Sequence, residues 1–340
     1  MKVDRFIRMP QTAWIYPLLA ALFYVVASSL GFADGLAPGL AGIALAVLLV
    51  PVLFGAIFAP VYHAEVIAHR TGEPYGTLIL TAAVTVIEVA LIASVMMSGS
   101  EGAPTLARDT VYAVVMTVCA GLAGICILVG GLHYREQSFR VTGASAYLTV
   151  LMVLATLLLY GAFLYIQTVR HRDYFIAPAP HHDWHFEPSA KRLAISGTLL
   201  LVALVTVVLL SKKFAVIVEL GRVAVGAPPQ ATGLVVAMLI LLPEGIAAVQ
   251  AARNDALQKA LNLALGSALA TIGMTFQAVA LVTLHLGKPL TLGLEPSGMI
   301  LLALTMLVST LTFATGRTHV LHGLVHLVIF ATFLFMSFQP

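Results

Sequence analysis

The hydrophobic residues of this chain fall into long runs that are separated by short polar segments. Ten runs are long enough to cross a bilayer as helices of about 20 residues. They extend over roughly 13–30, 39–59, 77–98, 110–132, 144–168, 193–210, 231–251, 260–286, 297–313 and 320–338. This pattern predicts an all-α polytopic membrane protein with about ten transmembrane helices.

Composition excludes a soluble globular chain. Sixty per cent of the residues are hydrophobic, 10% are charged and the mean hydropathy is +1.00, whereas soluble domains carry about 25% charged residues. The net charge of +3 is modest and the basic residues are spread over the loops, so we expect the lipid bilayer and not nucleic acid as the partner. A homo-oligomer agrees with the sequence, which does not fix the number of subunits.

Two acidic residues, Glu88 and Glu244, lie in the middle of long apolar runs. Placing a charged side chain at the centre of a membrane helix costs roughly 2.5 to 3.5 kcal/mol on insertion scales, so an acid in that position indicates a functional site. The alternative is a pair of acids that are neutralised by protonation or by a buried base.

The two glutamates occupy matching positions of an internal repeat. Each half of the chain carries an acidic residue, a Gly-x-Pro sequence and then a glutamate in an apolar run. The matched pairs are Glu65 with Glu219, Gly72 with Gly226 and Pro74 with Pro228 at an offset of 154, and Glu88 with Glu244 at an offset of 156. Such repeats are typical of secondary transporters, in which two halves form a site near the bilayer midplane.

The repeat divides the chain into four parts. Residues 1–38 form the N-terminal tail and first helix, 39–169 the first repeat, and 193–340 the second repeat. We expect the tail, which carries three basic residues, to be retained on the cytoplasmic side of the inner membrane. The polar linker 170–192 contains three histidines that favour a solvated loop over a metal sensor, namely His181, His182 and His185.

Several weaker candidates accompany the two glutamates. Asn262, Ser267 and Thr271 follow Glu244 in a run rich in small residues, and their amide and hydroxyl oxygens can bind a hard cation. Thr85 precedes Glu88 by three residues and can share its helix face. Helix packing and hydrogen bonds within one helix are the alternatives for these residues.

Six stretches resemble the bacterial calcium/proton antiporter family of the calcium/cation antiporter superfamily. They are HAEVIAHRTGEPYGTLILT, IEVALI, APTLARDTVYAVVM, LLPEG, NLALGSALATI and FATGRTHVLHG. The resemblance implies two inverted repeats of five helices after an extra first helix, eleven helices in all. It also implies one cation-binding and proton-binding glutamate in each repeat, at positions that correspond to Glu88 and Glu244.

The chemistry of the residues agrees with that implication. Two carboxylates match the charge of one Ca²⁺, and hydroxyl, amide and carbonyl oxygens can complete its ligand shell. Cations and protons would compete for the same oxygens, which is what antiport requires. We therefore expect Ca²⁺, or Na⁺ or K⁺, to be exchanged for H⁺ as transported substrates, with no cofactor. The alternatives are a membrane-embedded hydrolase that uses paired acids and a passive cation channel.

Other polar residues carry weaker hypotheses. Arg108 and Asp109 open an apolar run as a charge pair that forms either a gate or an interfacial anchor, and Glu65 and Glu219 either attract cations or face water. His319, His322 and His326 share a helix face that resembles a metal stripe, although packing and hydrogen bonding are favoured.

The number of crossings raises a conflict. In inverted repeats the helices of Glu88 and Glu244 cross the membrane in opposite directions, so the number of steps from one span to the next between them must be odd. Ten spans give four such steps. The single apolar run at 144–168 is too short for two full spans, yet basic residues favour the odd count by thirteen inside to five outside, compared with ten to eight for ten spans. A re-entrant pair of half-helices and the loss of one helix are the two explanations.

Overall fold

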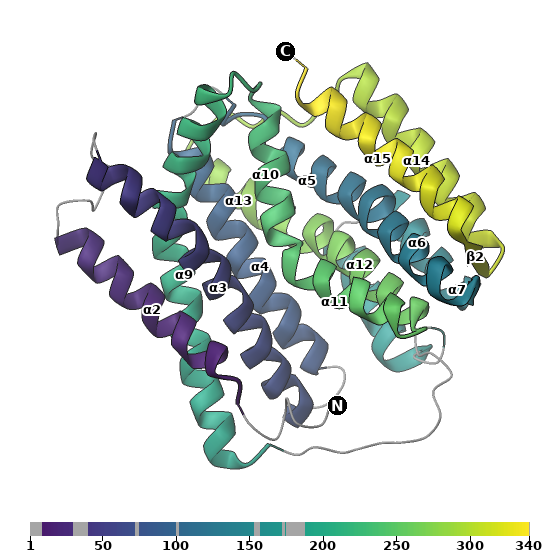
Figure 1. Ribbon diagram of the computed structural model, residues 1–340, viewed down its shortest axis with the longest axis horizontal. Coiled ribbons are helices and arrows are strands. Elements are labelled where there is room, and N and C mark those ends of the chain that lie inside the picture. The colour runs from purple at the N-terminus through teal and green to yellow at the C-terminus, as the bar shows by residue number, and fades with distance from the viewer. Residues whose placement is uncertain are drawn as a thin grey trace. The chain divides into compact units, whose positions relative to one another are not determined.

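The computed structural model describes residues 9–29, 40–71, 75–99, 102–152, 157–171, 174 and 188–339. Within these ranges the regular secondary structure is helical apart from one short two-stranded ribbon, which confirms the all-α prediction (Figure 1). Gly72, Pro74 and the linker histidines His181, His182 and His185 lie outside the described residues. The helices form two compact units, 1–103 with 183–225 and 104–182 with 226–340, each described by itself.

The first unit is a bundle of four helices, α2 (Gln11–Ser29), α3 (Leu40–Thr71), α4 (Tyr75–Met97) and α9 (Ala190–Ala224). Each of α3 and α9 packs against the other and against α2 and α4. Ser189 precedes α9 and caps it, because its hydroxyl accepts a hydrogen bond from the backbone N–H of Arg192 at 3.3 Å. The first helix of the second repeat thus packs among helices of the first, while the repeat boundaries remain a prediction from the sequence.

The second unit is organised around one long helix that runs from Leu106 to Tyr134. It consists of α5 (Leu106–Met116), the π-helical segment η1 (Thr117–Leu122) and α6 (Ala123–Tyr134). In its most apolar stretch 78% of the residues are buried, against 22 to 44% in the other long apolar helices of the described chain. Burial on all sides makes this helix the centre of the unit.

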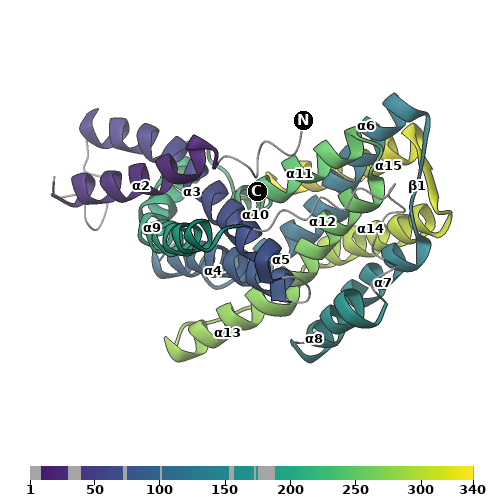
Figure 2. The same ribbon diagram turned by 90° about the horizontal axis from the view of Figure 1, so that it is seen from below.

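The remaining elements of the second unit are β1 (Glu136–Ser138), α7 (Val141–Met152), α8 (Leu157–Tyr165), η2 (Ile166–Arg170), α10 (Gln230–Ile240), α11 (Leu242–Arg253), α12 (Leu257–Ala270), η4 (Thr271–Thr275), α13 (Phe276–His285), α14 (Pro296–Ala314), β2 (Arg317–His319) and α15 (Val320–Ser337). Most of them pack against that central helix, while α7 packs on α12 and α14, and α8 packs on η4 (Figures 1 and 2).

The element order repeats after α2. α3, α4 and the helix α5–η1–α6 are followed by α7 and α8, and the second half has α9, α10–α11, α12–η4–α13, α14 and α15 in the same order. The two π-helical segments η1 and η4 begin at Thr117 and Thr271, which are 154 positions apart, the offset found in the sequence repeat. This order is that of a first helix followed by two five-part repeats.

The apolar run predicted at 144–168 is not one continuous helix, which corrects the ten-span assignment. The rings of Tyr147 on α7 and Phe163 on α8 lie with their centroids 5.0 Å apart, and Gln167 on η2 donates to the Tyr147 hydroxyl at 2.5 Å. In a continuous helix residues 147 and 163 would be about 24 Å apart. α7 and α8 are therefore a helical hairpin, and they lie next to each other in Figure 2.

The hairpin returns the chain to the end of the unit where it began. Gly143, in the first turn of α7, lies against the backbone carbonyl of Tyr174, which follows η2. Whether the pair counts as two short spans or as a re-entrant loop, it adds an even number of crossings. Counted in this way, the number of helix-to-helix steps between Glu88 and Glu244 becomes odd, as inverted repeats require, and the hairpin favours the re-entrant explanation over the loss of one helix.

Candidate functional site

Glu88 lies near the middle of α4, in the first unit. Only 1% of its surface is exposed, and Thr85, three residues earlier, is 8% exposed. Residues three apart lie on one face of a helix, so the Thr85 hydroxyl and the Glu88 carboxylate belong to the same buried face of α4. α4 is continuous through this region.

Glu244 lies in the second unit, at a break between two helices. α10 ends at Ile240, α11 begins at Leu242, and their axes differ by 56°. Pro243 accounts for the break, because proline has no N–H to donate to the preceding turn and its ring crowds that turn. Glu244 is thereby placed in the first turn of α11, half-buried, with its Oε2 atom shielded from solvent.

The repeat explains why one glutamate helix is broken and the other is not. At the offset that aligns Glu88 with Glu244, Pro243 corresponds to Ile87, which keeps its N–H and allows α4 to continue. A discontinuous helix at a substrate site is typical of secondary transporters, because the ends of the half-helices present free backbone groups.

The weaker candidates of the second repeat lie on the helix that packs against α11. Asn262 on α12 accepts a hydrogen bond from Gln258 at 2.8 Å through its side-chain oxygen. The Thr271 hydroxyl donates to the backbone carbonyl of Ser267 at 3.1 Å, as threonine often does within helices. Glu244 and these three residues thus come from neighbouring helices of one unit.

Thr117 is a further candidate that we did not predict from the sequence. It opens η1, its hydroxyl oxygen is buried, and that oxygen has no hydrogen-bond partner among the residues that the structure describes. α11 packs near η1, since a Cβ at Gly245 would lie 3.8 Å from Leu122. π-helical turns occur frequently at functional sites, and the offset of 154 from Thr271 is the signal in the sequence that identifies Thr117.

Glu88 and Glu244 belong to different units, so their meeting at one site remains a prediction. The acids near the ends of α3 and α9 differ from them: Glu65 is exposed. The carboxylate of Glu219 is paired with the guanidinium of Arg222 one turn later, with Oε1 and Nη2 2.5 Å apart. Glu219 is thus held in a local ion pair.

The three histidines do not form a metal stripe on one helix face, because His319 ends β2 and only His322 and His326 lie on α15. The rings of His319 and His322 stack with centroids 4.1 Å apart. His326 is fully buried, with Nδ1 2.8 Å from the carbonyl oxygen of Cys119 and Nε2 3.1 Å from the Thr312 hydroxyl. Across the described residues no group of three His, Cys, Asp or Glu side chains could hold a metal ion.

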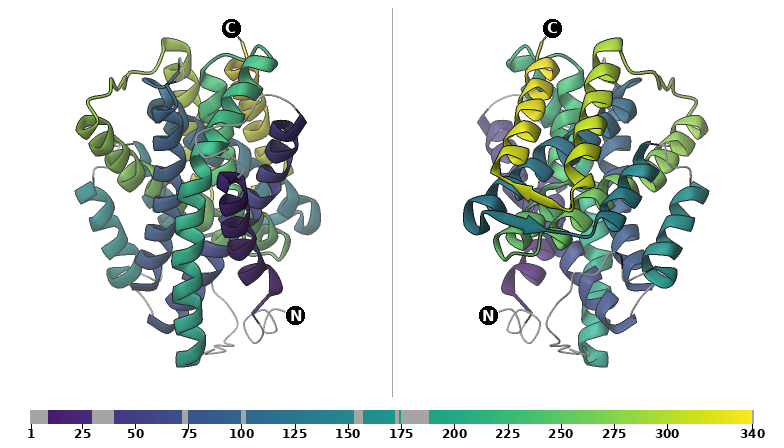
Figure 3. Two further views of the ribbon diagram at one scale, coloured as in Figure 1. Left: turned by 90° about the vertical axis from the view of Figure 1, so that its left-hand side faces the viewer. Right: turned by 90° about the vertical axis from the view of Figure 1, so that its right-hand side faces the viewer.

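One end of the second unit carries β1 and β2, which pair antiparallel with Gln137 opposite Thr318 (Figure 3). The Gln137 amide donates to the Ala252 carbonyl at 3.1 Å and to the Asp255 carboxylate at 3.0 Å. These bonds bring the ends of α6, α11 and α14 together with the starts of α7, α12 and α15.

Six basic residues of the described second unit gather at this end, namely Arg135, Arg140, Arg170, Arg253, Lys259 and Arg317. The opposite end, where α5, α10 and α14 begin, has two, Arg108 and Lys288. The positive-inside rule therefore predicts that the β1–β2 end faces the cytoplasm. The ten-span count would have placed Arg135 and Arg317 on opposite sides, and the pairing of β1 with β2 excludes that arrangement.

Comparison with known proteins adds evidence from outside the chain. Residues 18–171 and 195–339 each match the sodium/calcium exchanger protein family. The chain is 42% identical to the putative ionic transporter y4hA of Sinorhizobium fredii, over 98% of this chain and 97% of the relative. It is 35% identical to the sodium-potassium/proton antiporter ChaA of Escherichia coli, over 97% of each.

Two solved structures share the fold. Native YfkE matches with a TM-score of 0.69 at 15% identity, covering 96% of this chain and 99% of the other. The H⁺/Ca²⁺ exchanger CAX matches with a TM-score of 0.65 at 11% identity, covering 97% and 89%. At these identities the likeness concerns the fold alone, and it extends over nearly the whole chain.

Proposed function

Because the chain belongs to the sodium/calcium exchanger protein family, we propose that it is an antiporter that exchanges Ca²⁺ for protons, with Na⁺ and K⁺ as further transported cations. Family membership confirms the resemblance seen in the sequence and makes the chain a secondary transporter and not an enzyme. The hydrolase alternative is thereby excluded. The chain is a multi-pass membrane protein, and we place it in the inner membrane.

The observation that carries the proposal is the pair of glutamates at matching positions of two apolar helices. Glu88 is 1% exposed on α4, and Glu244 follows the break between α10 and α11. Two of the similar proteins support cations and protons as the exchanged species. One relative is named a sodium-potassium/proton antiporter, and one solved structure is named an H⁺/Ca²⁺ exchanger.

The site would work by competition for carboxylate oxygens. A cation bound between Glu88 and Glu244 would be balanced by their two charges, with hydroxyl and amide oxygens of Thr85, Thr117 and Asn262 available to complete the shell. Protons neutralise the same two carboxylates when the cation leaves. Because a charged carboxylate is costly in an apolar region, the empty site would not remain fully ionised, and each crossing would carry either cation or protons.

The break at Pro243 suggests where the protein moves between its two orientations. A discontinuous helix can change its bend with little loss of backbone hydrogen bonds, and alternating access arises when one part of a transporter rocks around a fixed site. Glu244 lies directly after the break, so its carboxylate would move with α11 and change its contact with the bound cation.

The test uses everted membrane vesicles in which an imposed proton gradient drives uptake of radioactive Ca²⁺, Na⁺ or K⁺. Glu88→Gln and Glu244→Gln should each abolish uptake, because an amide cannot exchange a proton for a cation. Glu136→Gln, at an exposed position of β1, is the matched control and should retain activity. Full activity in both glutamate variants would end the assignment, and uptake that ignores the proton gradient would indicate the passive channel.

A further inference from the structure

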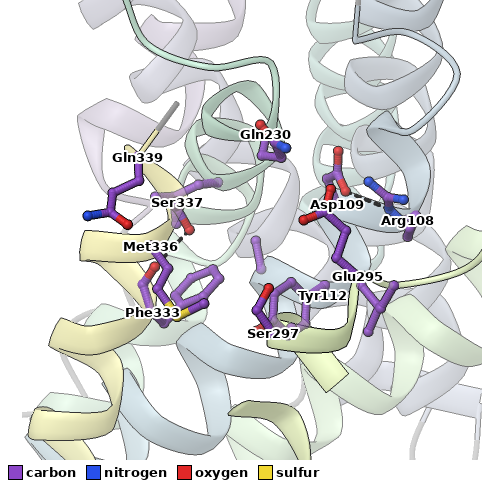
Figure 4. Close-up of a pocket in the computed structure, with 14 residues that line it drawn as sticks. Arg108, Asp109, Tyr112, Gln230, Glu295, Ser297, Phe333, Met336, Ser337 and Gln339 are labelled. Carbon is purple, nitrogen blue, oxygen red and sulfur yellow. Dashed lines mark hydrogen bonds and ion pairs between the residues drawn. The ribbon is translucent and has the colours of Figure 1, made fainter. Parts of the chain in front are cut away.

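We infer that the second unit carries an additional cation-binding site, separate from the glutamate site, in a pocket at the end opposite β1–β2. The pocket has a volume of about 470 Å³ and lies where α5, α10 and α14 begin and α15 ends (Figure 4). Its polar lining consists of Arg108, Asp109, Tyr112, Gln230, Glu295 and Ser297, with further polar groups from the end of α15. The charge distribution of the unit assigns this end to the outer side of the membrane.

Asp109 is the group that points to a ligand. Its side chain is only 7% exposed, and its Oδ1 accepts a hydrogen bond from Nε of Arg108 at 2.7 Å. Its Oδ2 is buried and has no hydrogen-bond partner among the residues that the structure describes. A buried carboxylate oxygen without a partner is costly. Asp109 lines the pocket, and a rotation of its carboxylate would bring Oδ2 to a cation bound there.

The charges of the lining favour a cation over an anion. Asp109 and Glu295 oppose the single guanidinium of Arg108, which leaves a net charge of −1. Arg108 is also occupied, because Nε donates to Asp109 and Nη1 donates to the carbonyl oxygen of Gly293 at 2.7 Å. In Figure 4 the Glu295 carboxylate lies on the same side of the pocket as Asp109.

The rim of the pocket is held in place without a ligand. The bond from Arg108 to Gly293 ties the segment before α14 to the start of α5, and the backbone N–H of Thr291 donates to the carbonyl oxygen of Pro104 at 2.9 Å. One turn further along α5, the ring of Tyr112 meets the ring of Phe333 on α15 edge to face, with centroids 5.3 Å apart. A site that is already shaped loses little ordering entropy when it binds.

The size of the pocket indicates the form in which the cation binds. A water molecule occupies about 30 Å³, so the pocket accommodates an ion together with several of its waters. Hard cations accept carboxylate, hydroxyl and amide oxygens at such sites and often keep part of their water shell. The ligand class is therefore a partly hydrated Na⁺, K⁺ or Ca²⁺ at the outer end of the protein.

The test measures binding of radioactive Ca²⁺ and Na⁺ to the purified full-length protein by equilibrium dialysis. Asp109→Asn should weaken one class of sites by about tenfold, which is the effect of about 1.4 kcal/mol, and it should do so whether or not Glu88 and Glu244 have been changed to Gln. The proposal is therefore separable from the glutamate site. Unchanged affinity and number of sites in a folded Asp109→Asn protein would overturn it.

A second variant guards against a loss of binding that reflects misfolding. Ser297→Asp, at an exposed position of the same lining, adds a carboxylate without breaking the contacts of Arg108 and should raise the affinity of this site severalfold, a gain that a misfolded protein would not produce. If Asp109 were only an interfacial anchor and the pocket bound no cation, Ser297→Asp would leave cation affinity unchanged, and that result would also overturn the proposal. Glu136→Gln at the β1–β2 end is the control and should bind as the unmodified protein does.

Discussion

The imidazole Nδ1 of His326 lies 2.8 Å from the carbonyl oxygen of Cys119, inside the π-helical segment η1. A carbonyl can only accept, so Nδ1 carries the proton, and Nε2 accepts from the Thr312 hydroxyl at 3.1 Å. A π-helical turn departs from the regular i→i−4 pattern, and a histidine from α15 supplies a donor there. His326 is thus a positioning residue for η1.

His326→Phe should lower the thermal stability of the protein, because the buried Cys119 carbonyl loses a partner at a cost of about 1 to 3 kcal/mol. Thermal unfolding of the purified protein in detergent measures the effect. His319→Gln, at an exposed position of β2, is the control and should unfold as the unmodified protein does. Equal unfolding temperatures for His326→Phe and the unmodified protein would contradict the role of His326.

Gly233 sets the approach of α10 to α5. A Cβ at this position would lie 2.9 Å from the Cβ of Asp109 and 2.9 Å from the backbone nitrogen of Thr110. Gly233→Ala should therefore push the two helices apart and destabilise the protein by about 1 to 3 kcal/mol. The same thermal assay applies to this variant.

Gly221→Ala is the matched control for that prediction. Gly221 is also helical, on α9, and a Cβ there would meet nothing within 4 Å. The change should be neutral or stabilising by about 0.5 to 1 kcal/mol, because alanine loses less entropy than glycine in a helix. A Gly233→Ala protein as stable as Gly221→Ala would show that the α5–α10 contact can adjust.

The hairpin of α7 and α8 predicts on which side of the membrane a single added cysteine will be labelled. Arg135→Cys, Arg170→Cys and Arg317→Cys should react with a membrane-impermeant maleimide from one side, and Lys288→Cys from the other. The native Cys119 and Cys126 are at most 1% exposed, so the unmodified protein gives the background. Labelling of Arg170→Cys from the same side as Lys288→Cys would mean that the run crosses the membrane once.

Much of the fold could be predicted from the sequence because membrane helices are read from hydrophobic length alone. The run that contains α7 and α8 could not be divided in this way. It is apolar throughout, and the contact of Tyr147 with Phe163 that folds it back is tertiary. The basic residues favoured the odd parity that the hairpin also gives, since their distribution depends on the side of the membrane and not on helix length.

The candidate site was predicted in part, for a similar reason. Glu88 and Glu244 are conspicuous because an acid in an apolar run is rare, whereas Thr117 resembles any buried threonine until its offset from Thr271 is noticed. Asp109 was found in the sequence, but its unsatisfied oxygen and the pocket beside it depend on α10 and α14 packing against α5. The surroundings of a side chain of this kind cannot be predicted from the hydropathy of the sequence.

Pro243 should matter for transport more than for stability. Pro243→Ala restores an N–H that can donate to the preceding turn, so the 56° bend between α10 and α11 should decrease and the Glu244 carboxylate should shift. We expect at least a tenfold loss of proton-driven cation uptake with an unfolding temperature that is unchanged or higher.

Pro296→Ala is the control, because Pro296 stands at the first position of α14, where proline replaces no intrahelical hydrogen bond. Its uptake should match that of the unmodified protein. The two prolines therefore separate a general effect of removing proline from the effect of straightening the helix at Glu244. Unimpaired uptake by Pro243→Ala would show that the carboxylate keeps its place without the break, and the movement proposed at Pro243 would have to be assigned elsewhere.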